Sequence, residues 1–412
     1  MAEIKRRRVT YKLYPTEEER IALEQTLELH CAIYNWTREH LIEADKKGKK
    51  LSYTDLCKLW TRYKKRHPKF KKVNAQSSQE TIQRACISFE TFRVKRSKGE
   101  AKGYPRAKKP HRIKGWGYKT HGDGNRVFSE GKHGSVSLSN IGVIPMRGEA
   151  RTTGTISTVG VKVKNRDWYL SVVHECEPQR THGTDQKSFD AGLMTYATIA
   201  NGDGTYEEIE NPRYYNKIKA QLKKAQKDLS RKKKGSKSWI RQKEKLGKLY
   251  TKLENQHQNF THQVSAALVK ESSFIATEDL DITKMMAHGG SYKKGLNKSI
   301  ADASWGKLMI KLGYKAEEAG IPFHIIPTQT VKPSQTCPQC GTQKKKHLSE
   351  RTHNCDCGLT LSRDQAAARV ILNWALFKSP YRPGTDLVLR EGSSLSVEAR
   401  NSRQSYEVTW RE

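Results

Sequence analysis

The chain of 412 residues contains no apolar run long enough to cross a bilayer, which takes about 20 consecutive apolar residues. Its first residues, MAEIKRRRV, lack an apolar segment after the charges, so we expect no secretory signal peptide. Acidic residues are scarce as well, because 43 Asp and Glu stand against 77 Lys and Arg, a net charge of +34. Solubility does not require such an excess, which indicates a polyanionic partner. We expect nucleic acid rather than an anionic membrane, and a cytoplasmic, nucleoid-associated protein.

Cysteine is also scarce, with eight residues in the whole chain. Half of them lie singly in apolar surroundings and are typical of buried thiols rather than of ligands or disulfides. These four are Cys31, Cys57, Cys86 and Cys176.

The other four cysteines form two close pairs, in TCPQCG and NCDCG, across a short polar loop. Four thiolates at this spacing predict a tetrahedral Zn²⁺ site, whereas a reducing compartment disfavours structural disulfides. The second pair is Cys-x-Cys, and His353, two residues before it, is a reserve ligand or simply a loop histidine. The predicted zinc ligands are Cys337, Cys340, Cys355 and Cys357.

The order of local patterns indicates an α+β multidomain chain. RRRVTYKLYP alternates like a strand and stops at Pro15, after which Thr16 and Glu19 form a capping box that begins a helix. Helical periodicity continues to about residue 97, and short β-rich pieces follow from about 113 to 176. A strand, then helices, then more strands predict a small β-barrel with a helical insertion. Alternating strands and helices follow from Lys187.

Three carboxylates occupy similar settings: Asp190 lies in an apolar strand, Glu278 ends another, and Asp364 opens a helix. Each has a local alternative. Asp190 could form the turn before Gly192, Glu278 could be a solvated strand end beside Asp279, and Asp364 on its own would be a helix cap. A lone carboxylate in a buried strand costs several kcal/mol, and a bound cation would offset that cost. Three oxygen ligands suit catalytic Mg²⁺, with Mn²⁺ as an alternative.

A strongly basic stretch supports nucleic-acid binding independently of the carboxylates. Few acidic residues interleave with these charges, so their mutual repulsion favours phosphate contacts over a solvated face. The predicted contacts are Lys217, Lys223, Lys224, Arg231, Lys232, Lys233 and Lys234. Aromatic residues between basic ones, such as Trp60, Phe70 and Trp116, could stack on bases, although core packing is their more frequent role.

Several segments occur in a characteristic order: YKLYPT, GYPRAKK, FDAGLMTYATIANG, ATEDLDITKM, SIADASWG and PSQTCPQCG…CDCGLTLSRD. With NPRYY…KAQKDLSRKKKGS they cover nearly all of residues 4–378. The chain thereby resembles the TnpB family of transposon-encoded, RNA-guided nucleases, relatives of the type V CRISPR effectors. The chain departs from the family at two positions. The family usually has Asp-Arg-Asp before the last helix, followed by Asn two residues on. Here Ser362 replaces the first Asp and Ala366 replaces the Asn. We expect this to weaken the positioning of the site or to loosen the start of the helix.

The resemblance implies an α/β RNase H-like RuvC nuclease domain with an inserted zinc ribbon, following a wedge-like β-barrel. It carries the catalytic, Mg²⁺-binding roles onto Asp190, Glu278 and Asp364, and contacts with a short DNA motif onto Tyr53 and Gln79. The implied domains are a first barrel strand (1–15), a helical recognition insertion (16–110), the remaining barrel (111–183), the nuclease domain (184–329 and 362–378), the zinc ribbon (330–361) and a disordered tail (379–412).

The expected activity is two-metal-ion hydrolysis of DNA phosphodiesters, directed by a transposon-derived guide RNA against double-stranded DNA next to a short motif. We expect a monomer in the RNA complex and no membrane partner. Two alternatives stay open: an RNA-guided DNA-binding regulator with weak catalysis, and a guide-free RuvC-like nuclease or transposase.

Overall fold

A computed structural model describes residues 5–100, 103–130, 132–148, 154–177, 180–287, 290, 293–347 and 349–381. The segment from 382 onward, most of the expected disordered tail, lies outside these residues. Within the described ranges, no helix is both long and apolar enough to span a membrane. The chain divides into two compact units, one of residues 1–183, 213–271 and 298–321 and one of residues 184–212, 272–297 and 322–412. The domain boundaries expected from sequence stay a prediction.

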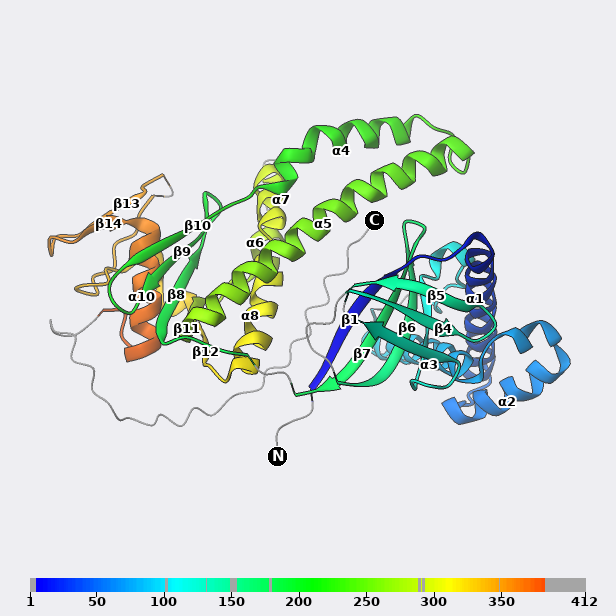
Figure 1. Cartoon of the computed structure of the whole chain (residues 1–412). Coiled ribbons are helices and arrows are strands. Elements are labelled where there is room, and N and C mark those ends of the chain that lie inside the picture. The colour runs from blue at the N-terminus through cyan, green and yellow to red at the C-terminus, as the bar shows by residue number, and fades with distance from the viewer. Residues whose placement is uncertain are drawn as a thin grey trace. The chain divides into compact units, whose positions relative to one another are not determined.

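The first unit contains an antiparallel seven-stranded sheet that curls around its own core (Figure 1). Its strands are β1 (Lys5–Leu13), β2 (Gly115–Tyr118), β3 (Asn125–Glu130), β4 (His133–Leu138), β5 (Gly142–Arg147), β6 (Thr155–Lys164) and β7 (Asp167–Cys176). The order is β2-β6-β7-β1-β5-β4-β3, so the first strand of the chain joins β7 to β5 in the middle. Alternating residues of the strands fill the interior, including Tyr11, Trp116, Ile144 and Leu170.

Between β1 and β2 the chain forms the predicted helical insertion. It consists of α1 (Glu17–Lys46), α2 (Tyr53–Arg66), η1 (Pro68–Lys72), α3 (Ala75–Ser97) and η2 (Pro110–Arg112). The capping box of Thr16 and Glu19 is confirmed, and a second one at Ser52 begins α2. The helices share a core that contains Trp60, Phe70 and Phe89.

The first unit also contains α4 (Tyr214–Ser230), α5 (Lys237–Glu271), α7 (Lys294–Ala303), of which residues 298–303 belong here, and α8 (Trp305–Ala319). The helices α4 and α5 form an antiparallel pair (Figure 1) joined by a short basic turn. Gly235 in that turn has φ +89°, a conformation that favours glycine. Ile218, Leu222 and Leu253 fill the space between the two helices.

The second unit is a five-stranded mixed sheet with a helix packed on it (Figure 1). Its strands are β8 (Asp185–Ala191), β9 (Thr195–Asn201), β10 (Tyr206–Glu210), β11 (Ser272–Glu278) and β12 (Phe323–Ile326), in the order β10-β9-β8-β11-β12. The pairs β10–β9 and β9–β8 are antiparallel, whereas β11 runs parallel to both β8 and β12. The packed helix is α10 (Arg363–Phe377), and its Val370, Ile371 and Ala375 meet Ala276 and Ile326 of the sheet.

Shorter elements complete the second unit: α6 (Ile282–Ala287), α9 (Thr328–Val331), η3 (Pro333–Gln335) and the hairpin of β13 (Thr352–Asn354) and β14 (Thr360–Ser362). The expected α+β architecture, with a helical insertion ahead of a second α/β unit, is confirmed at this level. The curled sheet pairs as an open row of strands with β2 and β3 at its ends within the described residues.

Candidate active site, cysteine cluster and basic surface

Strand pairing brings Asp190 and Glu278 to the same level of the sheet. In the parallel pair of β8 and β11, Phe189 is opposite Thr277, and Thr277 Oγ1 donates to the Phe189 carbonyl at 3.2 Å. One residue further along both strands lie Asp190 and Glu278. Both strands end here, so the two carboxylates lie at the carboxyl edge of the parallel pair.

The helix α10 carries Asp364 toward the same edge. Ser188 Oγ donates to the Ala368 carbonyl at 2.7 Å, which fixes the helix against β8. Asp190 lies two residues beyond Ser188 on the same face of the strand, about 7 Å away. Asp364 lies one helical turn before Ala368, about 6 Å along the axis. Residues 190, 278 and 364, far apart in sequence, therefore meet within one unit.

Asp364 is not the helix cap, which corrects the interpretation favoured by its local sequence. Ser362 is the N-cap: its Oγ accepts from Gln365 N at 3.1 Å, and Gln365 Oε1 accepts from Ser362 N at 3.2 Å. The expectation that Ser362 loosens the helix start is therefore wrong, since this reciprocal pair satisfies two N–H groups. Asp364 sits in the first turn, where the helix dipole favours a negative charge, and its carboxylate is not needed for capping.

Two of the carboxylates act electrostatically on the third. Burial raises the pKa of Asp190 well above its ordinary value, and the charges of Glu278 and Asp364 raise it further. Burial also raises the pKa of Glu278 to about 7, with Asp279 adding to the effect. Like charges held together at partly buried positions are costly, and a divalent cation between them would remove that cost.

The carboxylates do not form a compact ligand group by themselves. Within the described ranges, the four cysteines are the only group of three or more Cys, His, Asp or Glu residues whose ligand atoms all lie within 4.8 Å of one another. The three acidic side chains are spaced more widely than the oxygens around one ion.

Arg363 is a residue that the sequence reasoning left without a role. Its positive charge lowers the pKa of Asp190, opposing the effect of the other two acids. Its Nη1 donates to the His347 carbonyl at 3.0 Å, and its backbone N–H donates to Arg351 at 2.8 Å. Arg363 thus links the acidic site to the cysteine segment. In the sequence, only its position directly before Asp364 could have indicated this role.

The four predicted zinc ligands converge. Sγ atoms of Cys337 and Cys357 lie 3.7 Å apart, and those of Cys340 and Cys355 lie 3.5 Å apart. The four are free thiols rather than disulfides. Each pair sits in a tight turn that ends in a glycine at positive φ, Gly341 at +76° and Gly358 at +90°. Their N–H groups donate to the carbonyls of Cys337 and Cys355 at 3.0 and 2.9 Å, which curls each turn around its thiols.

The donor set fits Zn²⁺. Burial raises the pKa of Cys337 to about 12, so a thiolate at this position requires a neighbouring cation. The reserve ligand His353 is not one of the group: it lies buried in β13, and its Nδ1 contacts Lys346 Nζ. Four cysteines therefore form the metal site without the histidine.

The predicted basic contacts form one exposed region along α4 and its turn. The seven side chains at 217, 223, 224 and 231–234 are all exposed. The apolar face of the same helix, with Ile218 and Leu222, packs on α5. The charges are therefore on the solvent side of a packed helix.

Tyr53 and Gln79, the expected DNA-motif contacts, lie half-buried on α2 and α3. Lys119 Nζ donates to Tyr53 Oη at 2.7 Å and lies over its ring. Trp60, Phe70 and Trp116 are 1–3 % exposed, which confirms core packing rather than base stacking for these three.

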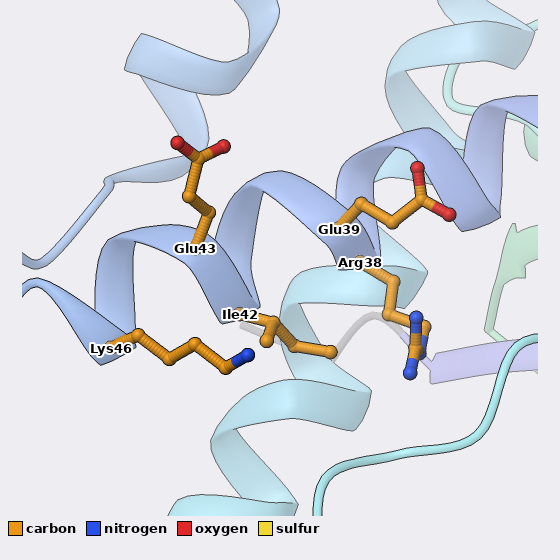
Figure 2. A pocket seen from close by; sticks show the side chains of 5 residues that line it. All are labelled: Arg38, Glu39, Ile42, Glu43 and Lys46. Atoms are coloured by element: carbon orange, nitrogen blue, oxygen red, sulfur yellow. The ribbon is translucent and has the colours of Figure 1, made fainter.

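A small hollow of about 290 Å³ on α1 is lined by Arg38, Glu39, Ile42, Glu43 and Lys46. Figure 2 shows that all five side chains come from this one helix, with both carboxylates directed away from Arg38. Its charges are mixed, and Glu43 is already paired with Lys47. The hollow therefore offers no chemistry comparable to the acidic or cysteine sites.

Comparisons with known proteins agree with this description. Residues 168–288 match the family OrfB_IS605, described as "Probable transposase", and residues 305–371 match the Cas12f1-like TNB domain. A protein of Streptomyces pristinaespiralis, named "Putative RNA-guided DNA endonuclease", is 28% identical over 387 residues, 90% of each chain. The Escherichia coli K12 protein named "Putative RNA-guided DNA endonuclease InsQ" is 29% identical over 317 residues, 72% of this chain and 73% of its own.

Solved structures of low identity share the fold. The protein in a Cas12f1–sgRNA–target DNA complex gives a TM-score of 0.59 at 13% identity, covering 90% of this chain and 99% of its own. The mini-RNA-guided endonuclease CRISPR-Cas_phi3 gives 0.51 at 9% identity, covering 90% and 92%. The two family matches and the two relatives agree with the resemblance of the motifs to the TnpB family, and the solved structures share the fold.

Proposed function

We propose that this protein is a transposon-encoded, RNA-guided DNA endonuclease whose active site consists of Asp190, Glu278 and Asp364. The observation that carries the proposal is the electrostatic effect of Glu278 and Asp364 on Asp190 at the end of β8 and β11. Burial and these two neighbouring charges raise the pKa of Asp190, and a bound divalent cation would stabilise its ionised form. Relatives that match 90% and 72% of this chain and are named as putative RNA-guided DNA endonucleases supply the substrate class.

The order of strands supports a RuvC-like, RNase H-type nuclease domain. Three antiparallel strands followed by two that run parallel to the first, with a helix packed on the sheet, form a frame that collects acids from separate strands and a helix. The curled sheet with its helical insertion would be the wedge-like barrel, and the β13–β14 hairpin, which carries Cys355 and Cys357, would form the zinc ribbon together with the turn of Cys337 and Cys340. Both are assigned here as parts of the proposal.

Mg²⁺, or Mn²⁺ in its place, would supply activation of a water and stabilisation of the leaving oxygen of a phosphodiester. Asp190, Glu278 and Asp364 would hold two such ions, and Arg363 would hold the start of α10 through its bonds to the His347 and Arg351 carbonyls. The four cysteines would hold a structural Zn²⁺.

The partners would be a guide RNA, which reads the target by base pairing, and double-stranded DNA, with Tyr53 and Gln79 next to the short adjacent motif. The lysines of α4 and the Arg231–Lys234 turn would contact phosphates without reading sequence. We expect one protein chain per RNA complex.

The proposal is tested with Asp190→Ala in the RNA-loaded protein, using a plasmid that matches the co-purified guide. We expect loss of cleavage by at least about 10³-fold, with RNA and plasmid binding unchanged. Asp203→Asn, which alters an exposed carboxylate in the β9–β10 turn, is the matched control and should cleave normally. Normal cleavage by Asp190→Ala would refute the site.

The same experiment separates the alternatives. A DNA-binding regulator would bind the matched plasmid in its wild-type form and leave it supercoiled. A guide-free nuclease would cleave after RNase treatment as well as before it. A defined RNA among the co-purified nucleic acids, together with cleavage that requires it, supports guidance.

A further inference from the structure

A second cavity, of about 330 Å³, lies in the first unit where α1 and α3 approach the segment that leads into β2. This volume lies within the usual range of small-ligand sites. None of the ten lining residues is acidic, and five are basic: Arg84, Lys108, Arg112, Lys114 and Lys162. The cavity is therefore built for an anion.

These cations are largely unneutralised. Arg84 is paired with Glu80 and also donates to the Gly115 carbonyl at 3.2 Å. Within the described parts of the chain, none of the other four has a carboxylate partner, and Lys108 Nζ instead lies 3.9 Å from the centre of the Tyr34 ring. Burial lowers the pKa of Lys162, and the charges of Arg8 and Arg84 lower it further. The crowding of positive charge would be relieved by a bound phosphate.

One of the lining residues, His30, also contains a buried hydrogen-bond acceptor. His30 is 1 % exposed and stacks on Trp116, with ring centres 5.3 Å apart. Thr81 Oγ1 donates to the Ser77 carbonyl at 3.1 Å, so its proton is engaged and it accepts from His30 Nδ1 at 2.7 Å. Burial, with Arg84, lowers the pKa of His30 to about 3, so the ring is neutral and Nε2 carries a lone pair. This buried Nε2 has no partner among the described residues.

A ligand for this cavity must combine an anion with a hydrogen-bond donor, and a nucleotide supplies the two at separate points, the phosphate and the sugar. We propose that the cavity binds one unpaired ribonucleotide, with its phosphate among Arg112, Lys114 and Lys162 and a sugar hydroxyl donating to His30 Nε2. The 2′-hydroxyl is a donor that every ribonucleotide carries and deoxyribonucleotides lack. The proposal rests on the proposed function for the source of that nucleotide, which is the guide RNA.

The test uses the full chain in two forms, RNA-loaded as purified and RNA-free after nuclease treatment. Uridine monophosphate, its 2′-deoxy analogue and inorganic phosphate are titrated into each form by calorimetry. We expect uridine monophosphate to bind the RNA-free form more tightly than the other two, and to bind the loaded form at least about tenfold more weakly, because guide RNA already fills the cavity. Equal binding to both forms would contradict guide RNA as the occupant.

Arg112→Gln/Lys114→Gln tests the position of the phosphate, since both side chains are exposed and their loss should not affect folding. We expect at least about tenfold weaker binding of uridine monophosphate. Lys49→Gln/Lys50→Gln removes the same charge from exposed positions that do not line the cavity and should bind as the wild type does. Equal loss in both double variants would overturn the site in favour of a general charge effect.

His30→Phe tests the acceptor, because the ring can still stack on Trp116 but has no nitrogen. We expect this variant to bind inorganic phosphate as the wild type does and to lose its preference for uridine monophosphate over the deoxy analogue. An unchanged preference would overturn the role of His30. These binding measurements do not involve cleavage. The cavity proposal can therefore fail while Asp190→Ala still supports the nuclease site, and the nuclease site can fail while the cavity proposal holds.

Discussion

At the scale of single residues, two lysines of α8 are buried against α5. Lys311 is 5 % exposed, and its Nζ donates to Gln258 Oε1 at 2.6 Å and to Thr261 Oγ1 at 2.7 Å. Lys315, one turn further, donates to Ser265 Oγ and to the His262 carbonyl, both at 2.7 Å. Oxygen dipoles therefore solvate these ammonium groups in the described structure, and burial lowers the pKa of Lys311 from 10.5 to about 8.

Lys311→Met should stabilise the first unit at neutral pH. Below pH 8 both folded and unfolded chains hold the Lys311 proton, and the folded state bears the cost of a buried charge. Between pH 8 and 10.5 only the unfolded chain retains it, so the wild type gains stability as pH rises. We expect the variant to exceed the wild type by roughly 1–2 kcal/mol at pH 7 and by less at pH 10. Urea unfolding at both pH values measures this.

Lys252→Met removes a charge from an exposed position of α5 and serves as the control. Its unfolding free energy should differ from that of the wild type by a similar, small amount at both pH values. If Lys311→Met behaved in the same way, Lys311 would not be the titrating group.

Several residue-level predictions from the sequence were confirmed because they depend only on local chemistry. Thr16 and Glu19 lie three residues apart in one turn. Each of the two turns that carry the cysteines is likewise closed by a bond between residues three or four positions apart in sequence. Local reasoning failed at Asp364 because the chain has two candidate N-caps, Ser362 and Asp364. Ser362 is the cap, and together with Gln365 it satisfies the backbone N–H groups of residues 365 and 362. The burial of Lys311 was not predicted, because a lysine in a helix is normally expected to face solvent.

At the scale of elements, the proposed active site depends on the register between β8 and β11, whose paired residues Phe189 and Thr277 lie 88 residues apart. Their apolar patterns predicted two strands, but no pattern in the sequence fixes which residue of a parallel strand is opposite which. The pairing of Phe189 with Thr277 in the folded chain puts Asp190 beside Glu278. The resemblance of the motifs, rather than periodicity, supplied the expectation that these acids belong together.

The cysteine segment is tied to α10 at both ends of the helix. Arg363 holds the carbonyls of His347 and Arg351, and Asn373 Nδ2 donates to the Pro338 carbonyl at 3.1 Å. We expect Cys337→Ser to lose Zn²⁺, to lower the melting temperature of the second unit by several degrees, and to reduce cleavage because the start of α10 is no longer held. Metal analysis, calorimetry and a plasmid cleavage assay measure these three effects.

Cys57→Ser changes a half-buried thiol outside the cluster and should keep one equivalent of zinc and full activity. Retention of zinc by Cys337→Ser, or a melting profile unchanged from the wild type, would contradict the four-cysteine site.

At the scale of the whole molecule, the net charge of +34 is distributed between a few dense clusters and a diffuse background. The turn Arg231–Lys234 carries four adjacent cations, all exposed, at the tip of the α4–α5 pair. Long-range charge attracts any polyanion, whereas phosphates in direct contact displace counterions one by one. The two contributions differ in how binding responds to salt.

Replacing Arg231, Lys232, Lys233 and Lys234 by glutamine should therefore reduce the salt dependence of RNA binding as well as the affinity. Each lost phosphate contact lowers the slope of log K against log salt by about 0.7 for single strands, so the slope should fall by up to roughly 3. Glutamine at Lys46, Lys47, Lys49 and Lys50, exposed at the end of α1, removes equal charge and should leave the slope nearly unchanged. Filter-binding assays from 50 to 300 mM salt measure the slope. An equal decrease of the slope in both variants would mean that the basic turn contributes only general electrostatic attraction. The proposed phosphate contacts of the turn would then be wrong.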